Sequence, residues 1–225
     1  MSLGHPRVHF RSTTSTNDRA RELASAGAPH GTLVTAAEQS QGRGRQGRGW
    51  SAPAGRALLC SLVIRGDPAL LSLAAGVAVA EVAGPAAAIK WPNDVLVDGR
   101  KVAGILVEGR PQEGWAVLGI GLNVAVREHD LPAELRDHAG SLGLEPDAVE
   151  AVLAGLLEAL EGWLGASAQQ IVAAVAARDA LLGAPVSWNG GVGRGAGIDG
   201  TGRLLVDTGG QLVALDAGEV HLAMR

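Results

Sequence analysis

The segment Gly42-Arg43-Gly44-Arg45-Gln46-Gly47-Arg48-Gly49-Trp50 is the most informative stretch of this 225-residue sequence. Glycine loses more backbone freedom on ordering than any other residue, so the segment is predicted to form a loop rather than a helix or a strand. Guanidinium groups make forked hydrogen bonds with carboxylates and phosphates. Three of them on such a pliable backbone predict a loop that closes over an anion, although a solvated basic loop would show the same pattern.

The spacing of apolar residues predicts both helices and strands around this loop. Predicted helices cover residues 18–26, 68–82, 147–164 and 168–182, and predicted strands cover residues 32–38, 57–64, 101–107 and 115–124. A hairpin is expected where Val95-Leu96-Val97 precedes residues 101–107, because the intervening Asp98-Gly99 favours a type I′ turn. We therefore expect an α+β fold in which helices pack against a mixed or antiparallel sheet.

After residue 184 the sequence changes to glycine-rich turns and short predicted strands, which cover residues 186–188, 195–199, 204–207 and 212–215. A segment of this length and pattern suits a small β-barrel. A boundary near Gly183 therefore divides the sequence into a domain of residues 1–182 and a C-terminal domain of residues 183–225.

The composition excludes several classes of protein. The formal net charge of −4 argues against nucleic acid as a partner. The longest apolar run, residues 69–83, contains Glu81 and is shorter than the roughly 20 residues that span a bilayer, so no membrane association is expected. The single cysteine, Cys60, lies in an apolar run and is interpreted as a buried structural thiol, which suits the reducing cytoplasm.

Two familiar nucleotide motifs can be set aside. The pattern Gly42-x-Gly44-x-x-Gly47 matches the dinucleotide-binding fingerprint, but Gly49 and Pro53 follow where that fingerprint requires a helix. Neither lysine of the chain precedes Ser or Thr, which excludes a Walker A loop. Those two lysines, Lys90 and Lys101, are the only ones among 19 basic residues, and they flank a run of four residues that ends in Asn93-Asp94. We therefore expect both lysines to be chemically required.

At this point five blocks of the sequence resemble the biotin protein ligases. They are Ser15-Thr16-Asn17; Gln39-x-x-Gly42-Arg43-Gly44-Arg45-x-Gly47-Arg48-x-Trp50; Lys90-Trp91-Pro92-Asn93-Asp94; Lys101-x-x-Gly104-Ile105-Leu106-Val107-Glu108; and Gly119-x-Gly121-x-Asn123. The blocks follow one another in the family's order over about 110 residues, which makes the resemblance specific.

The resemblance implies the class II synthetase-like fold of biotin and lipoate ligases, followed by an SH3-like C-terminal domain. It also implies a reaction in two steps: biotin and Mg²⁺-ATP give biotinyl-5′-AMP, and the biotinyl group then passes to one lysine of a biotin carboxyl carrier protein. Longer members begin with a helix-turn-helix, whereas Ser15 lies almost at the start of this sequence, so we expect a short form without DNA binding. Metal ligands remain unassigned.

The same resemblance implies a set of site residues. The biotin-binding set is Ser15, Thr16, Asn17, Gln39, Arg43, Gly44, Arg45, Lys101 and Gly104, and the ATP or adenylate-binding set is Arg48, Trp50, Lys90, Asn93, Asp94 and Asn123. A carboxylate and a polyphosphate repel each other, so cations are needed where they meet, and Lys101 and Arg45 are the expected catalytic residues. Hydroxyl and amide groups donate and accept hydrogen bonds, as a cyclic urea requires.

Alternative interpretations remain for several of these residues. Ser15 and Thr16 could simply cap the helix that follows them. Trp50 could be an ordinary core residue rather than a platform for adenine, and Asp94 could tie down the hairpin.

Rival functions and a partner also remain open. The nearer rival is a lipoate or octanoate ligase, and the farther one is a non-catalytic SH3-like module with a degenerate ligase domain. Residues 126–141 look short for the family's second adenylate-covering loop. A homodimer is also conceivable if residues 115–124 form an exposed strand edge.

Overall fold

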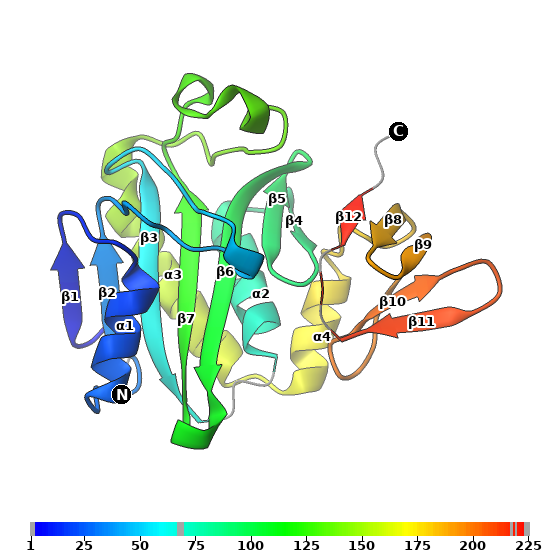
Figure 1. Ribbon diagram of the computed structural model, residues 1–225, viewed down its shortest axis with the longest axis horizontal. Helices are drawn as coiled ribbons and strands as arrows, with labels where there is room; N and C mark the ends of the chain where they lie inside the picture. The colour runs from blue at the N-terminus through cyan, green and yellow to red at the C-terminus, as the bar shows by residue number, and fades with distance from the viewer. Residues whose placement is uncertain (1–2, 67–69, 217, 219, 223–225) are drawn as a thin grey trace.

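The computed structural model describes residues 3–66, 70–216, 218 and 220–222, and its centre is a seven-stranded sheet (Figure 1). In sheet order the strands are β1 (Arg7–Phe10), β2 (Leu33–Ala36), β3 (Ala57–Arg65), β7 (Trp115–Asn123), β6 (Arg100–Arg110), β5 (Asp94–Val97) and β4 (Ala87–Lys90). Strands β1 and β2 are parallel, and every other neighbouring pair is antiparallel. The sheet is therefore mixed, as predicted.

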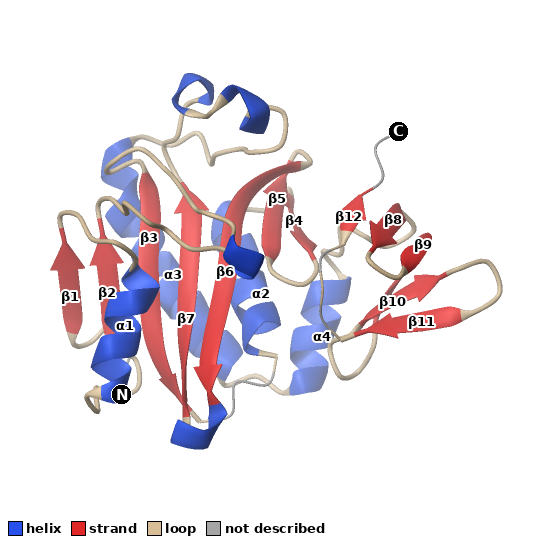
Figure 2. Cartoon of the chain, viewed as in Figure 1, coloured by secondary structure: helices blue, strands red, loops and turns tan. Residues whose placement is uncertain are grey.

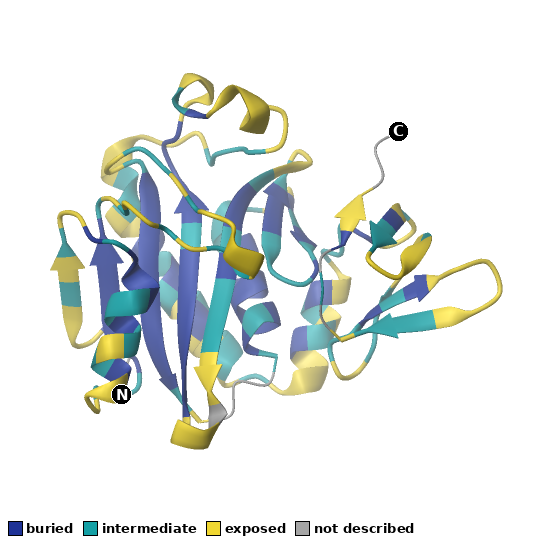
Figure 3. Ribbon diagram, viewed as in Figure 1, coloured by how far each residue is buried: buried dark blue, intermediate teal, exposed yellow. Residues whose placement is uncertain are grey.

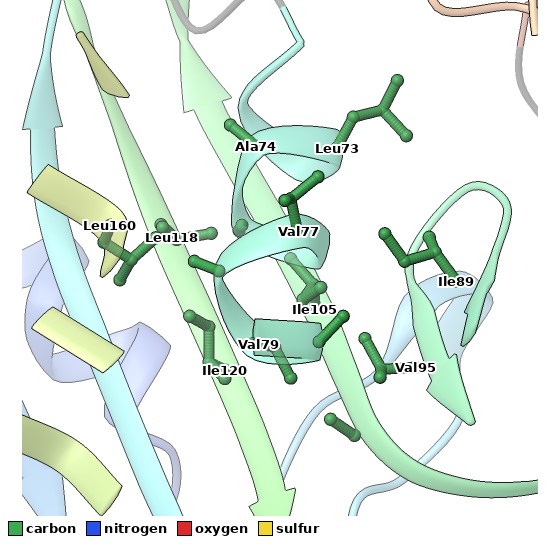
Figure 4. Packing of buried hydrophobic residues seen from close by; sticks show 14 of the residues in the cluster. Leu73, Ala74, Val77, Val79, Ile89, Val95, Ile105, Leu118, Ile120 and Leu160 are labelled. Atoms are coloured by element: carbon green, nitrogen blue, oxygen red, sulfur yellow. The ribbon is translucent and has the colours of Figure 1, made fainter. Parts of the chain in front are cut away.

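Helices cover the two faces of this sheet unequally (Figure 2). Helices α2 (Leu71–Ala83), α3 (Val149–Leu164) and α4 (Ala168–Ala176) lie on one side, while α1 (Thr16–Ser25) and the Gly/Arg loop, residues 42–49, lie on the other. Helix α2 is buried along most of its length, and it packs on the apolar side chains of β6 and β7 (Figure 4). Burying one such Leu or Val side chain stabilises the fold by about 1.5–3 kcal/mol.

The alternation of side chains along β7 explains how one strand serves both faces. Leu118 and Ile120 point into the helical core, so Gly119 and Gly121 face the opposite side. Burial follows the same logic: the central strands are buried, while β1 and the loop tips are exposed (Figure 3). The helical face thus carries the largest apolar cluster, while the opposite face holds two smaller ones, around Ala20 of α1 and around Leu59.

Two expectations about this domain are wrong. Strand β7 is not an exposed edge, because β3 and β6 pair with it on either side, and it cannot pair with a second copy. The helix predicted over residues 168–182 ends at Ala176. There Arg178 Nη1 donates to the carbonyls of Gly84 (3.1 Å) and Ala87 (3.2 Å), so the chain leaves the helix to run beside β4. Strands β1 and β4 were not predicted.

The predicted hairpin is confirmed, and it contains an irregularity. Asp98 (φ 51°) and Gly99 (φ 74°) both have positive φ, as a type I′ turn requires. Between Val95 and Leu96 the register with β6 shifts, because Val95 faces Ala103 whereas Leu96 faces Lys101. This β-bulge places one additional residue in β6, and bulges commonly re-aim a side chain beside a site.

The C-terminal segment forms a second, antiparallel sheet. Its order is β11 (Leu212–Leu215), β10 (Leu204–Asp207), β9 (Gly191–Ile198), β8 (Pro185–Trp188) and β12 (His221–Leu222). This sheet is consistent with the SH3-like domain, but over the described residues β11 and β12 do not pair, so the barrel is not closed. Val186, Leu204, Val206 and Val220 belong to the same buried cluster as α2 and the main sheet.

No helix among the described residues is both long and apolar enough to cross a lipid bilayer.

Candidate active site

Residues of α1, the Gly/Arg loop, β6 and β7 line one cavity. Figure 1 shows the loop on the same face of the sheet as α1. Most of the predicted site residues line this cavity together: Ser15, Thr16, Asn17, Gln39, Arg43, Gly44, Arg45, Arg48, Trp50, Asn93, Lys101 and Gly104. Neutral hydrogen-bonding groups gather at the start of α1, and the cationic groups come from the loop and from the start of β6. The cavity is therefore polar at one end and positively charged at the other.

The neutral end is a hydrogen-bonded group of buried side chains. The hydroxyl and the backbone N–H of Thr16 both donate to Gln39 Oε1, at 3.0 and 2.7 Å. Ser15 has extended backbone angles at the N-cap position, but its side chain makes no capping hydrogen bond, so the capping interpretation is wrong for Ser15. Its hydroxyl instead forms part of the cavity wall.

Asn17 is fixed on three sides. The Ser61 hydroxyl donates to Asn17 Oδ1 (2.6 Å), and Asn17 Nδ2 donates to Glu108 Oε2 (2.8 Å). A Cβ atom at Gly119 would lie 2.0 Å from Asn17 Oδ1, so only glycine fits beneath this amide. Asn17 is consequently held in one orientation before any ligand arrives.

Two glycines and an indole form the middle of the cavity. Gly104 and Gly121 face each other across β6 and β7. Trp50 packs on both, because a Cβ atom at Gly121 would come within 2.5 Å of Trp50 Cε2 and one at Gly104 within 3.1 Å of Trp50 Cζ3. The indole also packs on the cluster that contains Leu59, and its buried Nε1 has no hydrogen-bond partner among the described residues. Trp50 is therefore both a packing residue and part of the cavity wall.

Lys101 supplies the charge on the sheet side. Its Nζ lies 2.6 Å from Asp94 Oδ1 and 5.7 Å from the centroid of the Trp50 ring. The bulge in β6 explains this placement: strict alternation would put Lys101 and Gly104 on opposite faces, whereas both line the cavity. Asp94 thus pairs with Lys101 across the two strands of the hairpin, so this one contact both positions the lysine and ties down the hairpin.

The Gly/Arg loop closes the cavity as a narrow ribbon with a single 3₁₀ turn, Arg45–Gly47. The N–H of Gly44 donates to the Arg48 carbonyl (2.7 Å), and the N–H of Trp50 donates to the Gly42 carbonyl (2.9 Å). Every residue of the loop is exposed or only half-buried. The apolar core therefore contributes little to its position.

Side-chain contacts of two arginines hold the loop against the protein. Arg45 Nη1 donates to Asn93 Oδ1 (3.0 Å), and its Nη2 donates to the Gly218 carbonyl (3.1 Å). Arg43 pairs with Asp18 at 2.7 Å and with Glu108 at 2.8 Å. These charged contacts, together with the ribbon's own hydrogen bonds, account for the closed arrangement.

Three predicted residues lie outside this cavity. Lys90 and Asp94 line a small neighbouring cavity together with Arg45 and Arg48. Asn123 lies at the end of β7, where its Nδ2 donates to the Gly140 carbonyl (2.8 Å) and tethers the segment 126–141. The structure therefore separates them from the residues around Asn17.

Sequence reasoning missed Ser61 and the role of Glu108. Ser61 interrupts an apolar strand, which is a signal for a buried polar contact, and it is fully buried. Glu108 ends one of the quoted blocks, but nothing in the sequence indicates that its partners are Asn17 and Arg43.

Cys60 is confirmed as a buried thiol. Burial raises its pKa to about 12, an effect that the more distant Arg7 charge only partly offsets. A thiol with so high a pKa is a poor nucleophile, although Cys60 lies at the cavity wall.

Comparison with known proteins agrees with this geometry. Residues 9–124 match the biotin/lipoate A/B protein ligase family. The chain is 41% identical over 152 residues to the bifunctional ligase/repressor BirA of Bacillus subtilis; the match covers 62% of the chain, which spans about half (47%) of that relative's length. It is 38% identical over 237 residues to the biotin--[acetyl-CoA-carboxylase] ligase of Mycobacterium tuberculosis, covering 93% and 86% of the two chains. A solved biotin protein ligase from Aquifex aeolicus, in complex with biotin and ATP, superposes with a TM-score of 0.85 at 25% identity, covering 97% of this chain and 100% of the other.

Proposed function

Because the chain belongs to the biotin/lipoate A/B protein ligase family, we propose that it activates biotin with ATP and transfers it to a carrier-protein lysine. One observation carries the proposal. A single cavity joins a neutral hydrogen-bonding end, a flat middle formed by two glycines and an indole, and a cationic end. These three parts match the urea head, the unbranched chain and the carboxylate of biotin. In this proposal residues 1–182 carry the catalytic site and residues 183–225 form the second unit.

The neutral end would bind the ureido ring. A cyclic urea both donates and accepts hydrogen bonds, and hydroxyl and amide groups can answer both needs. Ser15 and Gln39 line this end, while Asn17 is already oriented by Ser61. Because these groups are positioned in advance, little ordering is required when the ring enters, which favours affinity.

The middle of the cavity would bind the unbranched chain. Gly104 and Gly121 leave no side chain between the strand backbones and Trp50. An unbranched alkyl tail that runs beside the indole, along the surface that Trp50 and the two glycines form together, would remove apolar area from water there.

The cationic end would assist the first chemical step. A biotin carboxylate oxygen attacks the α-phosphorus of ATP, a P–O bond forms, and the bond to the bridging oxygen breaks as pyrophosphate leaves with the electron pair. The reacting groups are both anions, and Lys101, Arg45 and Arg48 would offset their repulsion. Lys101 must exchange its contact with Asp94 for contacts with the reacting oxygens.

The neighbouring cavity would bind the nucleotide. Lys90, Asn93 and Asp94 line it with Arg48, and Asn123 has a buried Oδ1 without a hydrogen-bond partner among the described residues. Mg²⁺ usually binds through one or two carboxylates together with substrate phosphates. Asp94 is the carboxylate at this cavity and fits that pattern, and the ion would neutralise phosphate charge when bound. The described residues include no group of three His, Cys, Asp or Glu side chains arranged for a metal.

In the second step a carrier lysine would accept the biotinyl group. Its amine attacks the acyl carbon, the C–O bond to phosphate breaks, AMP leaves, and the amine loses a proton. The Gly/Arg loop covers the cavity, so it would shield the mixed anhydride from water and from other amines until the carrier binds.

Pyrophosphate release with ATP and either biotin, lipoate or octanoate tests the proposal. We expect turnover with biotin alone, followed by biotinylation of a biotin carboxyl carrier protein at one lysine. Turnover only with lipoate or octanoate would assign the chain to the other branch of the family. Turnover with none of the three would favour a non-catalytic interaction module.

A further inference from the structure

We propose that Glu108 couples closure of the Gly/Arg loop to occupation of the neutral end of the cavity. Glu108 is a positioning residue in this view, because it touches neither the reacting atoms nor the substrate. The inference rests on the proposed function for the identity of the ligand. The contacts that carry the inference lie within the chain and do not depend on that function.

The two oxygens of the Glu108 carboxylate serve two different parts of the site. Oε2 accepts a hydrogen bond from Asn17 Nδ2 (2.8 Å), at the neutral end. Oε1 lies 2.8 Å from Arg43 Nη2 in the loop and 3.8 Å from Arg21 Nη1 on α1. The side chain of Glu108 is 22% exposed, so it lies at the margin between the buried floor and the solvent-exposed loop.

The floor side of this link is rigid. Asn17 cannot turn to follow a moving carboxylate, because Ser61 holds its Oδ1 and Gly119 lies directly beneath it. Glu108 keeps its contact with Asn17 only in a narrow range of positions. In that same range of positions, Glu108 Oε1 can pair with the Arg43 guanidinium.

The loop side of the link is exposed or half-buried along its whole length. Arg43 is anchored by Glu108 and by Asp18, whose Oδ1 lies 2.7 Å from Arg43 Nη1 and also pairs with Arg21. The guanidinium therefore holds the loop to the protein and is already engaged by two carboxylates. A ligand that fixes Asn17 more firmly also fixes Glu108 in the position that receives Arg43, and by thermodynamic reciprocity a closed loop strengthens binding at Asn17.

Glu108→Gln is the direct test, because glutamine keeps an acceptor for Asn17 but loses the charge that attracts Arg43. We expect amide exchange at residues 42–49 of the ligand-free protein to become about tenfold faster, within the usual range of coupling between sites. Biotin dissociation should accelerate by a similar factor, while kcat at saturating biotin changes less than KM. Arg43→Gln, at an exposed position where folding is not at risk, should reproduce both effects.

Glu150→Gln is the matched control. It removes the two-pronged contact between Glu150 and Arg7, a glutamate–arginine pair away from the cavity, and it should leave loop exchange and biotin dissociation unchanged. Combining Glu108→Gln with Arg43→Gln should add little to Arg43→Gln alone, because Arg43→Gln already removes the contact with Glu108.

Ser61→Ala distinguishes coupling from a simple structural role. Ser61 contacts Asn17 and Thr16 but no loop residue. We expect its loss to speed exchange at residues 42–49 in the otherwise unchanged protein, and to have no such effect once Glu108 is glutamine. Equal loop exchange in the unchanged protein and the Glu108→Gln variant would overturn the inference even if biotin binds. Failure of the unchanged protein to bind biotin would overturn the proposed function instead, and the Ser61→Ala exchange result would still decide the coupling.

Discussion

The floor and the cover of the cavity are built in opposite ways. On the floor, Ser61 is fully buried and Asn17 is 4% exposed. The two are hydrogen-bonded to each other, and the helix and strand that carry them, α1 and β3, pack together through a buried apolar cluster. The cover is the Gly/Arg loop, none of whose residues is buried, and charged contacts of Arg43 and Arg45 hold it in place. The floor is therefore as stable as the fold, whereas the cover can open locally without unfolding anything else.

This difference assigns separate tasks to the two regions. A preformed floor recognises a ligand with little ordering cost, and a weakly held cover can admit the substrate and release the product. Ordering one residue costs about 1–2 kcal/mol, so the nine residues from Gly42 to Trp50 cost on the order of 10–18 kcal/mol. Charge-assisted hydrogen bonds return about 1.5–3 kcal/mol each. Bound carboxylate and phosphate groups would therefore shift the cover toward the closed form.

The largest effect is expected where floor chemistry is removed outright. Lys101→Ala should abolish adenylate formation, with a loss of at least about 10³-fold, whereas Lys90→Ala should weaken ATP use less. Single-turnover adenylation measures both. Because Lys101→Ala leaves the Asp94 carboxylate without its cation, the melting temperature of the variant separates lost chemistry from local disorder. Equal losses for the two lysines would contradict the ranking.

The next test asks whether the floor is truly rigid. Gly119→Ala introduces a methyl group 2.0 Å from Asn17 Oδ1, and we expect biotin affinity to fall by about 100-fold, or roughly 3 kcal/mol, by calorimetry. Gly162→Ala is the control, since no atom lies within 4 Å of its added Cβ atom and alanine favours a helix. Unchanged biotin affinity in Gly119→Ala would show that Asn17 can move aside, which would contradict a rigid floor.

The cover should be tested for retention rather than for chemistry. Arg45→Gly removes the contacts with Asn93 and the Gly218 carbonyl, so biotinyl-AMP should escape about tenfold faster and label bystander lysines. Arg110→Gly, at the far end of β6, controls for the loss of an arginine.

The mobility of the cover can be measured directly by amide hydrogen exchange. Amide exchange at residues 42–49 should be faster in the empty protein than with biotin and ATP present. Equally slow exchange in both states, or intact adenylate retention and carrier selectivity in Arg45→Gly, would contradict the idea of a loosely held cover.

The smallest effect is expected for Arg7 and Glu150, a charged pair that lies on a strand and a helix rather than on a loop. The hydrogen bonds from Arg7 lower the pKa of Glu150, against a smaller opposing effect of burial. Because the folded-state pKa lies below the unfolded one, the stabilisation is present above the unfolded pKa near 4.3 and disappears as the pH falls through the folded value. At pH 7, Glu150→Gln should cost about 0.5 kcal/mol or less, because the pair is solvent-screened. Melting curves between pH 3 and 7 should converge at the acid end; a constant difference would contradict this assignment.

The sequence predicted the long strands better than the short ones. The strands predicted over residues 57–64, 101–107 and 115–124 correspond to β3, β6 and β7, whereas the four-residue strands β1 and β4 were missed. The order of the strands in the sheet could not be predicted. Strand β7 pairs with β3, whose residues lie fifty or more positions earlier in the sequence, and no local pattern indicates that pairing. For the same reason the end of α4 escaped prediction: Arg178 leaves the helix to bind carbonyls on another element.

The site was predicted as a set of residues but not as an arrangement. Lys101 and Gly104 are three positions apart, which in a regular strand puts them on opposite faces, and only the register with β5 reveals the bulge that unites them. Glu108 was quoted as part of a block without a role, because its partners come from α1 and the loop. Local chemistry was therefore predictable, while contacts between distant segments were not.

The sharing of one apolar core by both sheets has a consequence for synthesis on the ribosome. Leu70 and Leu73 pack so closely against Gly202 that a Cβ atom there would lie 2.3 Å from Leu70 Cδ2. A nascent chain that has reached the end of α4 therefore still exposes this surface. At about 5–20 residues per second, the remaining stretch up to β12, about 45 residues, takes roughly 2–9 s to emerge. During that interval the nascent chain is an incompletely folded intermediate with exposed apolar surface, and chaperones that recognise such surface can bind it.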